Sequence, residues 1–488
     1  MKKFSLVAGL LLTLLAAVLV VNTLNFSSRQ LAYPPVAAPV LDEEAVLQRF
    51  SSIVQLQTVS PANAEDFDPA PFEALHTYLA EAFPLVHTRL SKQVVGEFTL
   101  LYHLPGADDS LAPMMLMAHM DVVPVEESTR DQWLQDPFSG AVRDGEIFGR
   151  GTLDNKASMT GILEAMELLL AQGFAPQRGI YILIGHDEEL GGLQGAALVA
   201  EQFEREQLRL EFVLDEGLAI AKRLGSFENP VALIGIAEKG TVSLELTARA
   251  LGGHSSQPPS VTSIGSLARA LAALEAEQFP ARLSGAVEAM FDTLSREMGF
   301  GMRMLFANRW LTESVIVKLL EKNEPLLPMM HTTTAPTMLQ SGVKSNVMPT
   351  VATAVVNFRV LPGDTIEAVT EHARTVINNP AVEVSIRGHD GITGNPSPIS
   401  NPQAPAYKIV EKTIRQVFPD VVVAPGLVMG GTDSKHFVRV SDNIYRFVPF
   451  RISKQNVNSV HGINERIAVG DYLGIVAFYT QLMQNASG

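Results

Sequence analysis

The chain has 488 residues, of which 47% are hydrophobic and 18% charged, and its formal net charge is -15. This length exceeds what one hydrophobic core usually supports, so two domains are expected. The acidic balance, without any cluster of Lys and Arg, argues against a nucleic-acid partner. The absence of cysteine excludes disulfides, thiolate metal sites and cysteine catalysis, so any metal must be held by His, Asp and Glu.

An apolar segment follows Lys2 and Lys3 directly. No Asp, Glu, Lys or Arg occurs from Phe4 to Ser28, and the apolar run is near the ~18 residues that favour a membrane-spanning helix. We predict that residues 1–28 are a signal anchor that leaves the rest of the chain outside the cytoplasm, periplasmic or extracellular. A cleaved signal peptide and a secreted product are the alternative. The proline-bearing residues 29–41 are expected to form a linker.

The region after the linker shows the pattern of an α/β domain. Residues 114–118 and 180–184 are short, wholly apolar runs, which are typical of buried parallel strands. Residues 158–170 are apolar at helical spacing, and residues 212–214 predict another buried strand. In an open α/β sheet, ligands bind beyond the carboxyl ends of the strands. The polar residues expected at these ends are His119, Glu188, Glu189, Asp215 and Glu216.

From residue 239 onward the pattern changes to α+β. Three predicted strands alternate with two predicted helices, at residues 241–250, 264–277, 352–360, 365–377 and 382–387. This order predicts a small inserted domain with its helices on one face of a sheet, over residues 239–392. Residues 42–238 and 393–488 would then form the two parts of one larger domain.

Residues 285–335 form an apolar insert within the expected small domain. They are rich in Met, Phe and Leu and include Trp310. The pattern is compatible with helices that pack within the domain. It is also compatible with an adaptable wall for an acyl chain, since Met-rich surfaces repack easily, or with contact with a membrane surface.

Four short motifs carry the candidate chemistry. They are His119-Met120-Asp121, Asp154-Asn155-Lys156, Glu188-Glu189 and His461-Gly462-Ile463-Asn464-Glu465. Together they supply two imidazoles and several carboxylates, the ligands that hard or borderline divalent metals bind. The sequence contains no H-E-x-x-H, no G-x-S-x-G and no P-loop. It therefore predicts metal-assisted hydrolysis.

A pair of metals ~3.5–4 Å apart requires a bridging ligand. Asp154 is the candidate bridge, because a carboxylate has two oxygens. The candidate ligands that complete the two sites are His119 with Asp215 or Glu216, and Glu189 with His461.

Two acidic residues of these motifs remain for other roles. Asp121 lies two residues after His119, where a carboxylate can orient a ligand imidazole. Glu188 is adjacent to Glu189, so Glu189 can bind metal while Glu188 acts as the general base.

At these motifs the chain resembles the di-zinc aminoacylase/carboxypeptidase family, which includes aminoacylase-1, glutamate carboxypeptidase and succinyl-diaminopimelate desuccinylase. His119–Pro124 and Gly151–Lys156 are most similar to the branch of carboxypeptidase S and the N-fatty-acyl-amino-acid synthase/hydrolase. The resemblance implies an α/β zinc-peptidase fold, with a mixed sheet flanked by helices and a ferredoxin-like lid that often mediates dimerisation. It implies two Zn²⁺ per subunit, which Co²⁺ or Mn²⁺ could replace. It favours Glu216 as a ligand and keeps Asp215 as the alternative.

The resemblance also implies residues that contact substrate. His254 matches the histidine that reaches the scissile carbonyl, often from the partner subunit, and could stabilise the oxyanion. Asn346, Arg359 and Gly430-Gly431-Thr432 resemble the pocket for the substrate carboxylate. Arg359 suits this role because its planar guanidinium can bind a carboxylate through two hydrogen bonds.

The expected function is hydrolysis of an amide bond beside an amino acid with a free carboxylate. Substrates would be N-acyl amino acids, including fatty-acyl ones, or peptide C-termini. The expected partners are this substrate, a membrane through the N-terminal segment, and a second copy of the chain through the lid. The alternative is a non-catalytic binding or scaffold protein that keeps the same fold.

Overall fold

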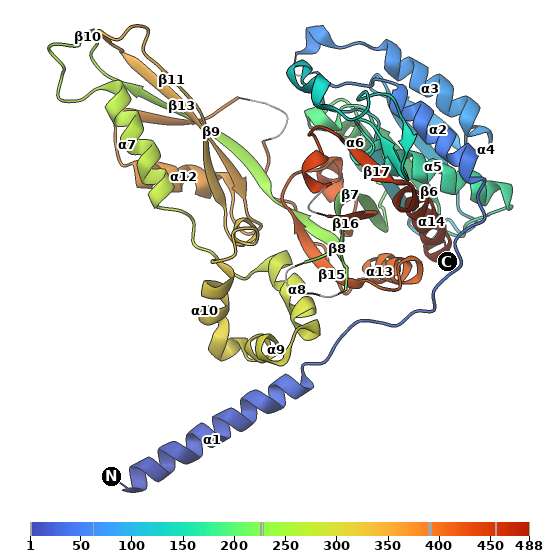
Figure 1. Cartoon of the computed structure of the whole chain (residues 1–488), viewed down its shortest axis with the longest axis horizontal. Coiled ribbons are helices and arrows are strands. Elements are labelled where there is room, and N and C mark those ends of the chain that lie inside the picture. The colour runs from blue at the N-terminus through green and yellow to red at the C-terminus, as the bar shows by residue number, and fades with distance from the viewer. Residues whose placement is uncertain are drawn as a thin grey trace. The chain divides into compact units, whose positions relative to one another are not determined.

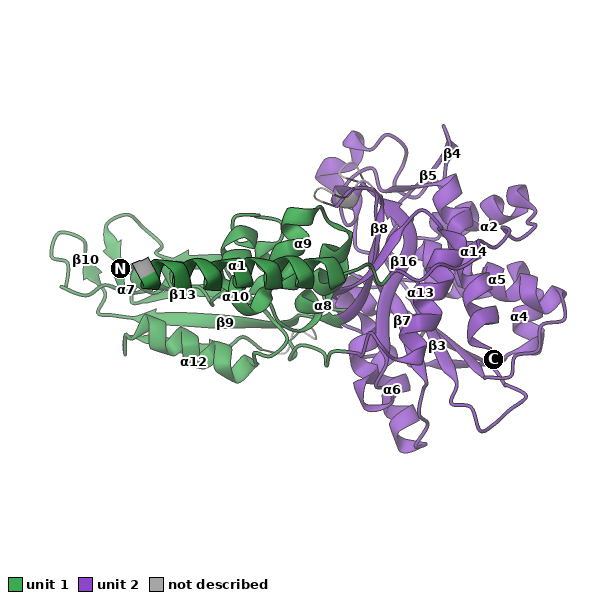
Figure 2. Ribbon diagram, turned by 90° about the horizontal axis from the view of Figure 1, so that it is seen from below, with its two compact units in different colours: residues 1–29, 237–399, 429–431 green, residues 30–236, 400–428, 432–488 purple. Residues whose placement is uncertain are grey.

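The computed structural model describes residues 2–61, 63–224, 227, 229–388, 393–453 and 456–487. Figure 2 shows its two compact units. The large unit contains residues 30–236, 400–428 and 432–488, and the small unit contains residues 1–29, 237–399 and 429–431. The expected inserted domain falls within the small unit, although its expected end at residue 392 lies outside the described residues.

The large unit is built on an eight-stranded mixed sheet in the order β1-β2-β6-β3-β7-β16-β8-β15 (Figure 1). Its strands are β1 (Ser91–Val95), β2 (Thr99–Leu104), β3 (Met114–His119), β6 (Ile180–Gly185), β7 (Phe212–Ala221), β8 (Val231–Glu238), β15 (Val422–Val428) and β16 (Ile444–Ile452). The four central strands β6, β3, β7 and β16 are parallel to one another, and they pair antiparallel with the flanking strands β2 and β8. The apolar runs predicted to be parallel strands thus form β3 and β6, because both of their faces are covered.

The large unit also contains α-helices. They are α2 (Glu43–Gln55), α3 (Ala70–Ala82), α4 (Pro84–Arg89), α5 (Lys156–Ala171), α6 (Ala196–Arg205), α13 (Pro405–Val417) and α14 (Val469–Ala486). Asp42 caps α2 by accepting a hydrogen bond from the Ala45 backbone N–H at 3.2 Å. A small sheet of β4 (Val142–Arg143), β5 (Glu146–Phe148) and β17 (Arg466–Ala468) brings the C-terminal segment beside the segment that precedes Asp154.

Strand β7 is longer than the sequence predicts. The expected strand ended at Leu214, whereas β7 continues to Ala221 through Asp215 and Glu216. Its pairing with β3 does stop at Leu214, but its pairing with β16 continues with an irregular register. Asp215 and Glu216 therefore lie within a strand, where consecutive side chains point to opposite faces.

The small unit contains a four-stranded antiparallel sheet in the order β11-β13-β9-β14. Its strands are β9 (Gly240–Arg249), β11 (Thr333–Ser341), β13 (Val351–Val360) and β14 (Val382–Ile386), and its helices are α7 (Ser263–Ala276) and α12 (Ile366–Ile377). Apolar side chains of both helices and of β9, β13 and β14 form one core. The chain order β9-α7-β11-β13-α12-β14 contains one strand, β11, that the sequence analysis missed.

The remaining elements of the small unit are helical except for one short strand pair. Helices α8 (Gly285–Leu294), α9 (Phe300–Ala307), α10 (Arg309–Leu320) and α11 (Leu327–Met330) lie in the apolar insert. The strand pair is β10 (Gly253–His254) with β12 (Val347–Met348). Helix α1 (Lys2–Asn25) is the one helix in the described part of the chain that is long and apolar enough to cross a membrane.

Candidate metal centre

The loops after β3 and β6 are joined through Asp121. Its carboxylate accepts hydrogen bonds from the backbone N–H groups of Glu188 at 3.2 Å and Glu189 at 3.1 Å. It also accepts one from the Ser60 hydroxyl at 2.7 Å. The ring nitrogen Nδ1 of His119 lies 3.0 Å from the Asp121 carbonyl oxygen and 3.3 Å from its carboxylate. Asp121 therefore fixes both the imidazole and the Glu188–Glu189 backbone, and it is fully buried.

His119, Asp154 and Glu216 form the first group that could hold a metal ion. The Nε2 atom of His119 lies 3.0 Å from Oδ1 of Asp154 and 3.4 Å from Oε1 of Glu216. The side-chain amide of Asn155 donates a hydrogen bond to the other Glu216 oxygen. All three candidate ligand atoms lie within 4.8 Å of one another.

Asp154, Glu189 and His461 form the second group. The Nε2 atom of His461 lies 3.0 Å from Oδ2 of Asp154 and 3.3 Å from Oε1 of Glu189. The two oxygens of Asp154 thus face different imidazoles, which is the arrangement of a bridging carboxylate. The His461 side chain is 50% exposed while that of His119 is 2% exposed, so the centre is accessible from the His461 side.

The electrostatics of this cluster favour added positive charge. Burial, followed by the charge of Asp154, raises the pKa of Glu216 to about 7. Hydrogen bonds with Asp154 and Glu189 raise the pKa of His461 to about 10, because these carboxylates attract positive charge at its Nε2 atom. Several carboxylates share a buried site with only two imidazoles, and buried like charges are costly unless cations compensate them. The donor set of imidazole nitrogens and carboxylate oxygens fits two zinc ions.

Glu188 belongs to neither ligand group. Its backbone is held by Asp121, and its side chain lies in the same cluster. Burial is the main reason that the pKa of Glu188 is raised well above its usual value, and the charge of Glu216 adds to it. A raised pKa makes the Glu188 carboxylate a stronger base.

The geometry separates the two alternatives, Asp215 and Glu216. Glu216 faces His119, as described above. The Asp215 carboxylate instead accepts hydrogen bonds from the backbone N–H groups of Glu216 at 2.8 Å and Ser434 at 2.9 Å. Because neighbours in a strand point to opposite faces, only one of the pair can face the cluster. Asp215 lies outside both groups and holds the loop at Ser434.

Glu465 has a role that the sequence analysis did not assign. One of its carboxylate oxygens accepts hydrogen bonds from the backbone N–H groups of Gly151 at 3.0 Å, Leu153 at 2.8 Å and Asp154 at 3.3 Å. The other oxygen pairs with the Arg150 guanidinium at 2.6 Å, and both side chains are buried. Glu465 therefore fixes the loop that presents Asp154. Its place in the His461 motif was the only signal in the sequence.

The candidate substrate residues of the small unit lie in two separate places, beside the short strand pair β10–β12 and near the end of β13. His254 in β10 pairs with Val347, and the Ser255 backbone N–H donates to the Asn346 carbonyl at 3.2 Å, so His254 and Asn346 are neighbours. Arg359 pairs with Thr241 at the opposite end of β13. Eight residues of strand separate Val351 from Arg359, which at about 3.3 Å per residue is a span of roughly 26 Å. One chain therefore does not bring Asn346 and Arg359 to the same substrate carboxylate, contrary to the expectation.

The glycine-rich segment lies where the chain passes between the units. Gly430 and Gly431 belong to the small unit and Thr432 to the large unit. Both glycines are exposed, and a Cβ atom at either would meet nothing within 4 Å. Thr432 is buried, with its hydroxyl 2.6 Å from that of Ser434.

Comparison with known proteins places this centre in a family. A profile of peptidase family M20/M25/M40 matches residues 115–485. The chain is 37% identical to the probable carboxypeptidase S-like 2 of Dictyostelium discoideum, over 99% of this chain and 95% of that protein. It is 39% identical to the N-fatty-acyl-amino acid synthase/hydrolase PM20D1 of Xenopus tropicalis, over 91% of this chain and 86% of that protein.

A solved structure shows the same fold. The M20 family metallo-carboxypeptidase Sso-CP2 from Sulfolobus solfataricus superimposes with a TM-score of 0.64 at 18% identity, covering 91% of this chain and 99% of that one. At this identity the likeness supports the fold alone, a mixed α/β architecture. The relatives of this chain include carboxypeptidase S-like proteins and N-fatty-acyl-amino acid synthase/hydrolases. The family profile and these relatives show that this chain belongs to peptidase family M20/M25/M40 and is a hydrolase of that metallopeptidase family.

Proposed function

We propose that the large unit holds two zinc ions and hydrolyses an amide bond beside an amino acid that has a free carboxylate. The observation that carries the proposal is the position of Asp154, whose two oxygens each lie 3.0 Å from a different imidazole. His119 and Glu216 would hold one ion with Asp154, and Glu189 and His461 the other. Zinc bound there would supply a nucleophilic water at neutral pH and polarise the scissile carbonyl. Co²⁺ or Mn²⁺ could occupy the same donor set.

Glu188 moves the proton in this proposal. It is adjacent to the ligand Glu189 but outside both ligand groups, and Asp121 fixes its backbone. Its carboxylate takes a proton from the attacking water and later gives it to the departing amine. The raised pKa of Glu188 supports this role, because a stronger base accepts the proton more readily.

The substrate class follows from Arg359 and from the relatives. The Arg359 guanidinium donates one hydrogen bond to the Thr241 hydroxyl at 3.0 Å and has further N–H groups that can bind a carboxylate. One relative is named as an N-fatty-acyl-amino acid synthase/hydrolase and another as carboxypeptidase S-like. N-acyl amino acids, including those with long acyl chains, and peptide C-termini are therefore the proposed substrates.

We infer that the small unit is a ferredoxin-like lid and dimerisation domain; the chain order of its sheet and two helices, β9-α7-β11-β13-α12-β14, supports this. His254 and Asn346 lie together at the strand pair β10–β12, from which the chain enters β13 at the end remote from Arg359. In a dimer, these two residues of one copy would contact the substrate that Arg359 of the other copy holds. His254 would donate a hydrogen bond to the oxyanion.

Helix α1 is proposed to anchor the chain in a membrane. It is long and apolar enough to span the bilayer, and Lys2 and Lys3 at its start favour the cytoplasmic side for that end. The catalytic unit would then lie outside the cytoplasm. Identifying the N-terminal residue of the mature protein distinguishes a signal anchor from a cleaved signal peptide.

A hydrolysis screen tests the function directly. The substrates are N-acyl amino acids of increasing acyl length, dipeptides, and the same compounds with an amidated carboxyl group, each with and without a chelator. We expect chelator-sensitive hydrolysis of compounds with a free carboxylate and much slower hydrolysis of the amidated ones. Metal binding without any hydrolysis would instead support the alternative of a non-catalytic binding or scaffold protein.

A further inference from the structure

The apolar insert is joined to helix α1 by specific polar contacts. The side-chain amide of Asn308, between α9 and α10, donates to the Leu19 carbonyl at 3.1 Å. Its oxygen accepts a hydrogen bond from the Asn22 side chain at 2.9 Å. Asn308 is fully buried. Helices α1 and α9 thus pack together near the C-terminal end of α1, as Figure 1 also shows.

A second set of contacts joins the insert to the residues just after α1. The Arg296 guanidinium lies 3.8 Å from the centre of the Phe26 ring and donates to the Ser27 carbonyl at 3.1 Å. Arg29 forms an ion pair with Asp292 at 2.9 Å. Attachment on both sides of residue Asn25 fixes how the insert is oriented around the end of α1.

The insert exposes large apolar side chains. The exposed members on α9 and α10 are Phe300, Trp310, Leu311, Val315 and Leu319, each between 44% and 64% exposed. On α10, Leu311, Val315 and Leu319 are four residues apart and form one ridge along the helix. Ile316 and Leu320 of the same helix are buried, so the ridge is not the face that packs within the unit.

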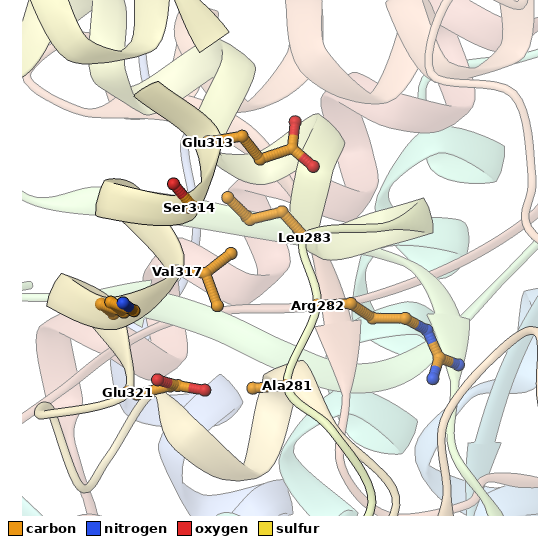
Figure 3. A pocket seen from close by; sticks show the side chains of 8 residues that line it. Ala281, Arg282, Leu283, Glu313, Ser314, Val317 and Glu321 are labelled. Atoms are coloured by element: carbon orange, nitrogen blue, oxygen red, sulfur yellow. The ribbon is translucent and has the colours of Figure 1, made fainter. Parts of the chain in front are cut away.

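A cavity beside α10 does not provide an apolar pocket for these side chains. It has a volume of about 430 Å³ and lies between α10 and residues 281–283 (Figure 3). Four charged residues line it: Arg282, Glu313, Lys318 and Glu321. An acyl chain in this cavity would meet charged groups, so the cavity does not support a role of the insert as an acyl-binding wall. The ridge of Leu311, Val315 and Leu319 is on a different side of α10 from the residues that line this cavity. Trp310 precedes Glu313 and Ser314 by one turn, so it shares the cavity-lining side at the start of the helix.

We propose that residues 285–320 are a membrane-contact element, whose exposed apolar side chains on α9 and α10 enter the outer boundary of the same bilayer that α1 spans. A spanning helix requires about 20 residues, so Leu19 and Asn22 lie near the outer interface when Lys3 is at the inner one. Asn308 binds both, and this contact places α9 and the start of α10 at the same depth. Tryptophan, as at position Trp310, is enriched at that depth. Phenylalanine, as at Phe300, occurs on the apolar face of helices that lie in the interface.

The charges of the insert identify which lipids it would bind. Acidic and basic residues are nearly balanced between 285 and 335. Contact with the bilayer would therefore depend on apolar burial rather than on anionic headgroups, so zwitterionic phosphatidylcholine is sufficient. The proposal rests on the anchor role of α1 and is independent of the hydrolase chemistry. It places the small unit at a lipid surface, where N-acyl amino acids with long chains accumulate.

Tryptophan fluorescence tests the proposal, because the chain has only two tryptophans, Trp133 and Trp310. The full chain is reconstituted into phosphatidylcholine vesicles with or without bromine on the lipid acyl chains, and the Trp310→Phe variant is treated in parallel. We expect brominated lipid to quench the wild-type emission and the variant to lose most of that quenching. Wild-type emission that brominated lipid leaves unchanged, or quenching that the variant keeps in full, would overturn the proposal. If the chain does not remain with the vesicles, α1 is not a membrane anchor and the proposal fails, whether or not the protein is an active hydrolase.

Cross-linking tests the attachment of the insert to α1 in the bilayer. The chain has no cysteine, so the pair Asn22→Cys and Asn308→Cys introduces the only two thiols. The control pair is Asn22→Cys and Asn323→Cys, since Asn323 lies beyond the far end of α10. A short bismaleimide should join the first pair in vesicles and not the second. Equal linkage of both pairs, or linkage of neither, would contradict the proposed arrangement.

Discussion

At the scale of single residues, the chemistry depends on how firmly Asp154 is held between the two imidazoles. Burial acts to raise the pKa of Asp154, but hydrogen bonds from His119 and His461 outweigh it and hold that pKa below its usual value. Asp154 is thus ionised and able to bridge two cations. The sequence identified this residue because it lies in a motif of known type. It could not assign Glu465, because the three backbone N–H groups that Glu465 accepts from are more than 300 positions away.

The neighbours Glu188 and Glu189 provide a matched pair of substitutions. Glu188→Gln should lower turnover by about 10²-fold or more and leave the zinc content unchanged, because the residue moves a proton and binds no metal. Glu189→Gln should lower the zinc content, because it removes a ligand of the second group. Elemental mass spectrometry and steady-state kinetics on both variants check this. Loss of zinc from the Glu188→Gln protein would refute the assignment of the base.

Glu465→Gln should destabilise the large unit and weaken metal binding together. The substitution leaves the buried Arg150 guanidinium without its partner, and breaking a buried pair costs about 3–5 kcal/mol. Glu146→Gln is the control: it breaks a pair with Arg466 that is more exposed, and such a pair contributes at most about 1 kcal/mol. Thermal unfolding of both variants measures the difference. Equal shifts of the unfolding midpoint would show that Glu465 does not hold the loop.

At the scale of elements, strong patterns were predicted and weak ones were missed. The short, wholly apolar runs of β3 and β6 are typical of buried strands, and they form strands as expected. Strand β11 was missed because most of its residues are exposed and Pro336 interrupts it. Proline is tolerated at the edge of a sheet or at an irregularity, and β11 has both features. Single-sequence patterns do not show such positions.

Lys239, directly before β9, has a buried side-chain amine that makes the free energy of unfolding depend on pH. The Lys239 ammonium nitrogen donates to the carbonyls of Pro328 at 2.7 Å and His331 at 2.8 Å, and the residue is 2% exposed. Burial, followed by the charge of Arg359, lowers the pKa of Lys239 to about 7. Because the unfolded chain keeps this proton up to a pH near 10, it binds more protons than the folded chain between pH 7 and 10. Stability from this group therefore rises with pH over that interval.

Lys239→Met should remove this pH dependence. The free energy of unfolding of the wild-type protein should rise by up to about 1.4 kcal/mol per pH unit relative to the variant between pH 7 and 10. Denaturant unfolding of both proteins across this range provides the comparison. Parallel curves for the two proteins would mean that the folded state keeps Lys239 protonated.

At the scale of the whole molecule, the arrangement of the small unit's sheet limits what one chain can do alone. The family resemblance grouped Asn346 with Arg359, but the register of β13 with β9 separates them by most of the strand. Register is set by pairings between residues about 100 positions apart, so it could not be read from the local pattern. The expected boundaries of the inserted domain, residues 239 and 392, remain predictions; the compact small unit comprises residues 1–29, 237–399 and 429–431.

Mixed subunits test whether His254 acts on a partner's substrate. His254→Ala and Glu188→Gln should each be nearly inactive alone. When the two variants are co-expressed, a dimer with one chain of each kind contains one complete site if His254 acts between subunits. Partial recovery of hydrolysis is therefore expected, measured on the purified mixed dimer. A mixed dimer without activity would show that His254 serves its own chain or none.

Anomalous X-ray scattering at the zinc edge, from crystals of the metal-loaded chain, tests the central claim most directly. We expect two zinc peaks, about 3.5–4 Å apart, one on each side of the Asp154 carboxylate. The first should lie beside His119 and Glu216 and the second beside Glu189 and His461. A single peak, or peaks remote from Asp154, would contradict the paired-metal centre.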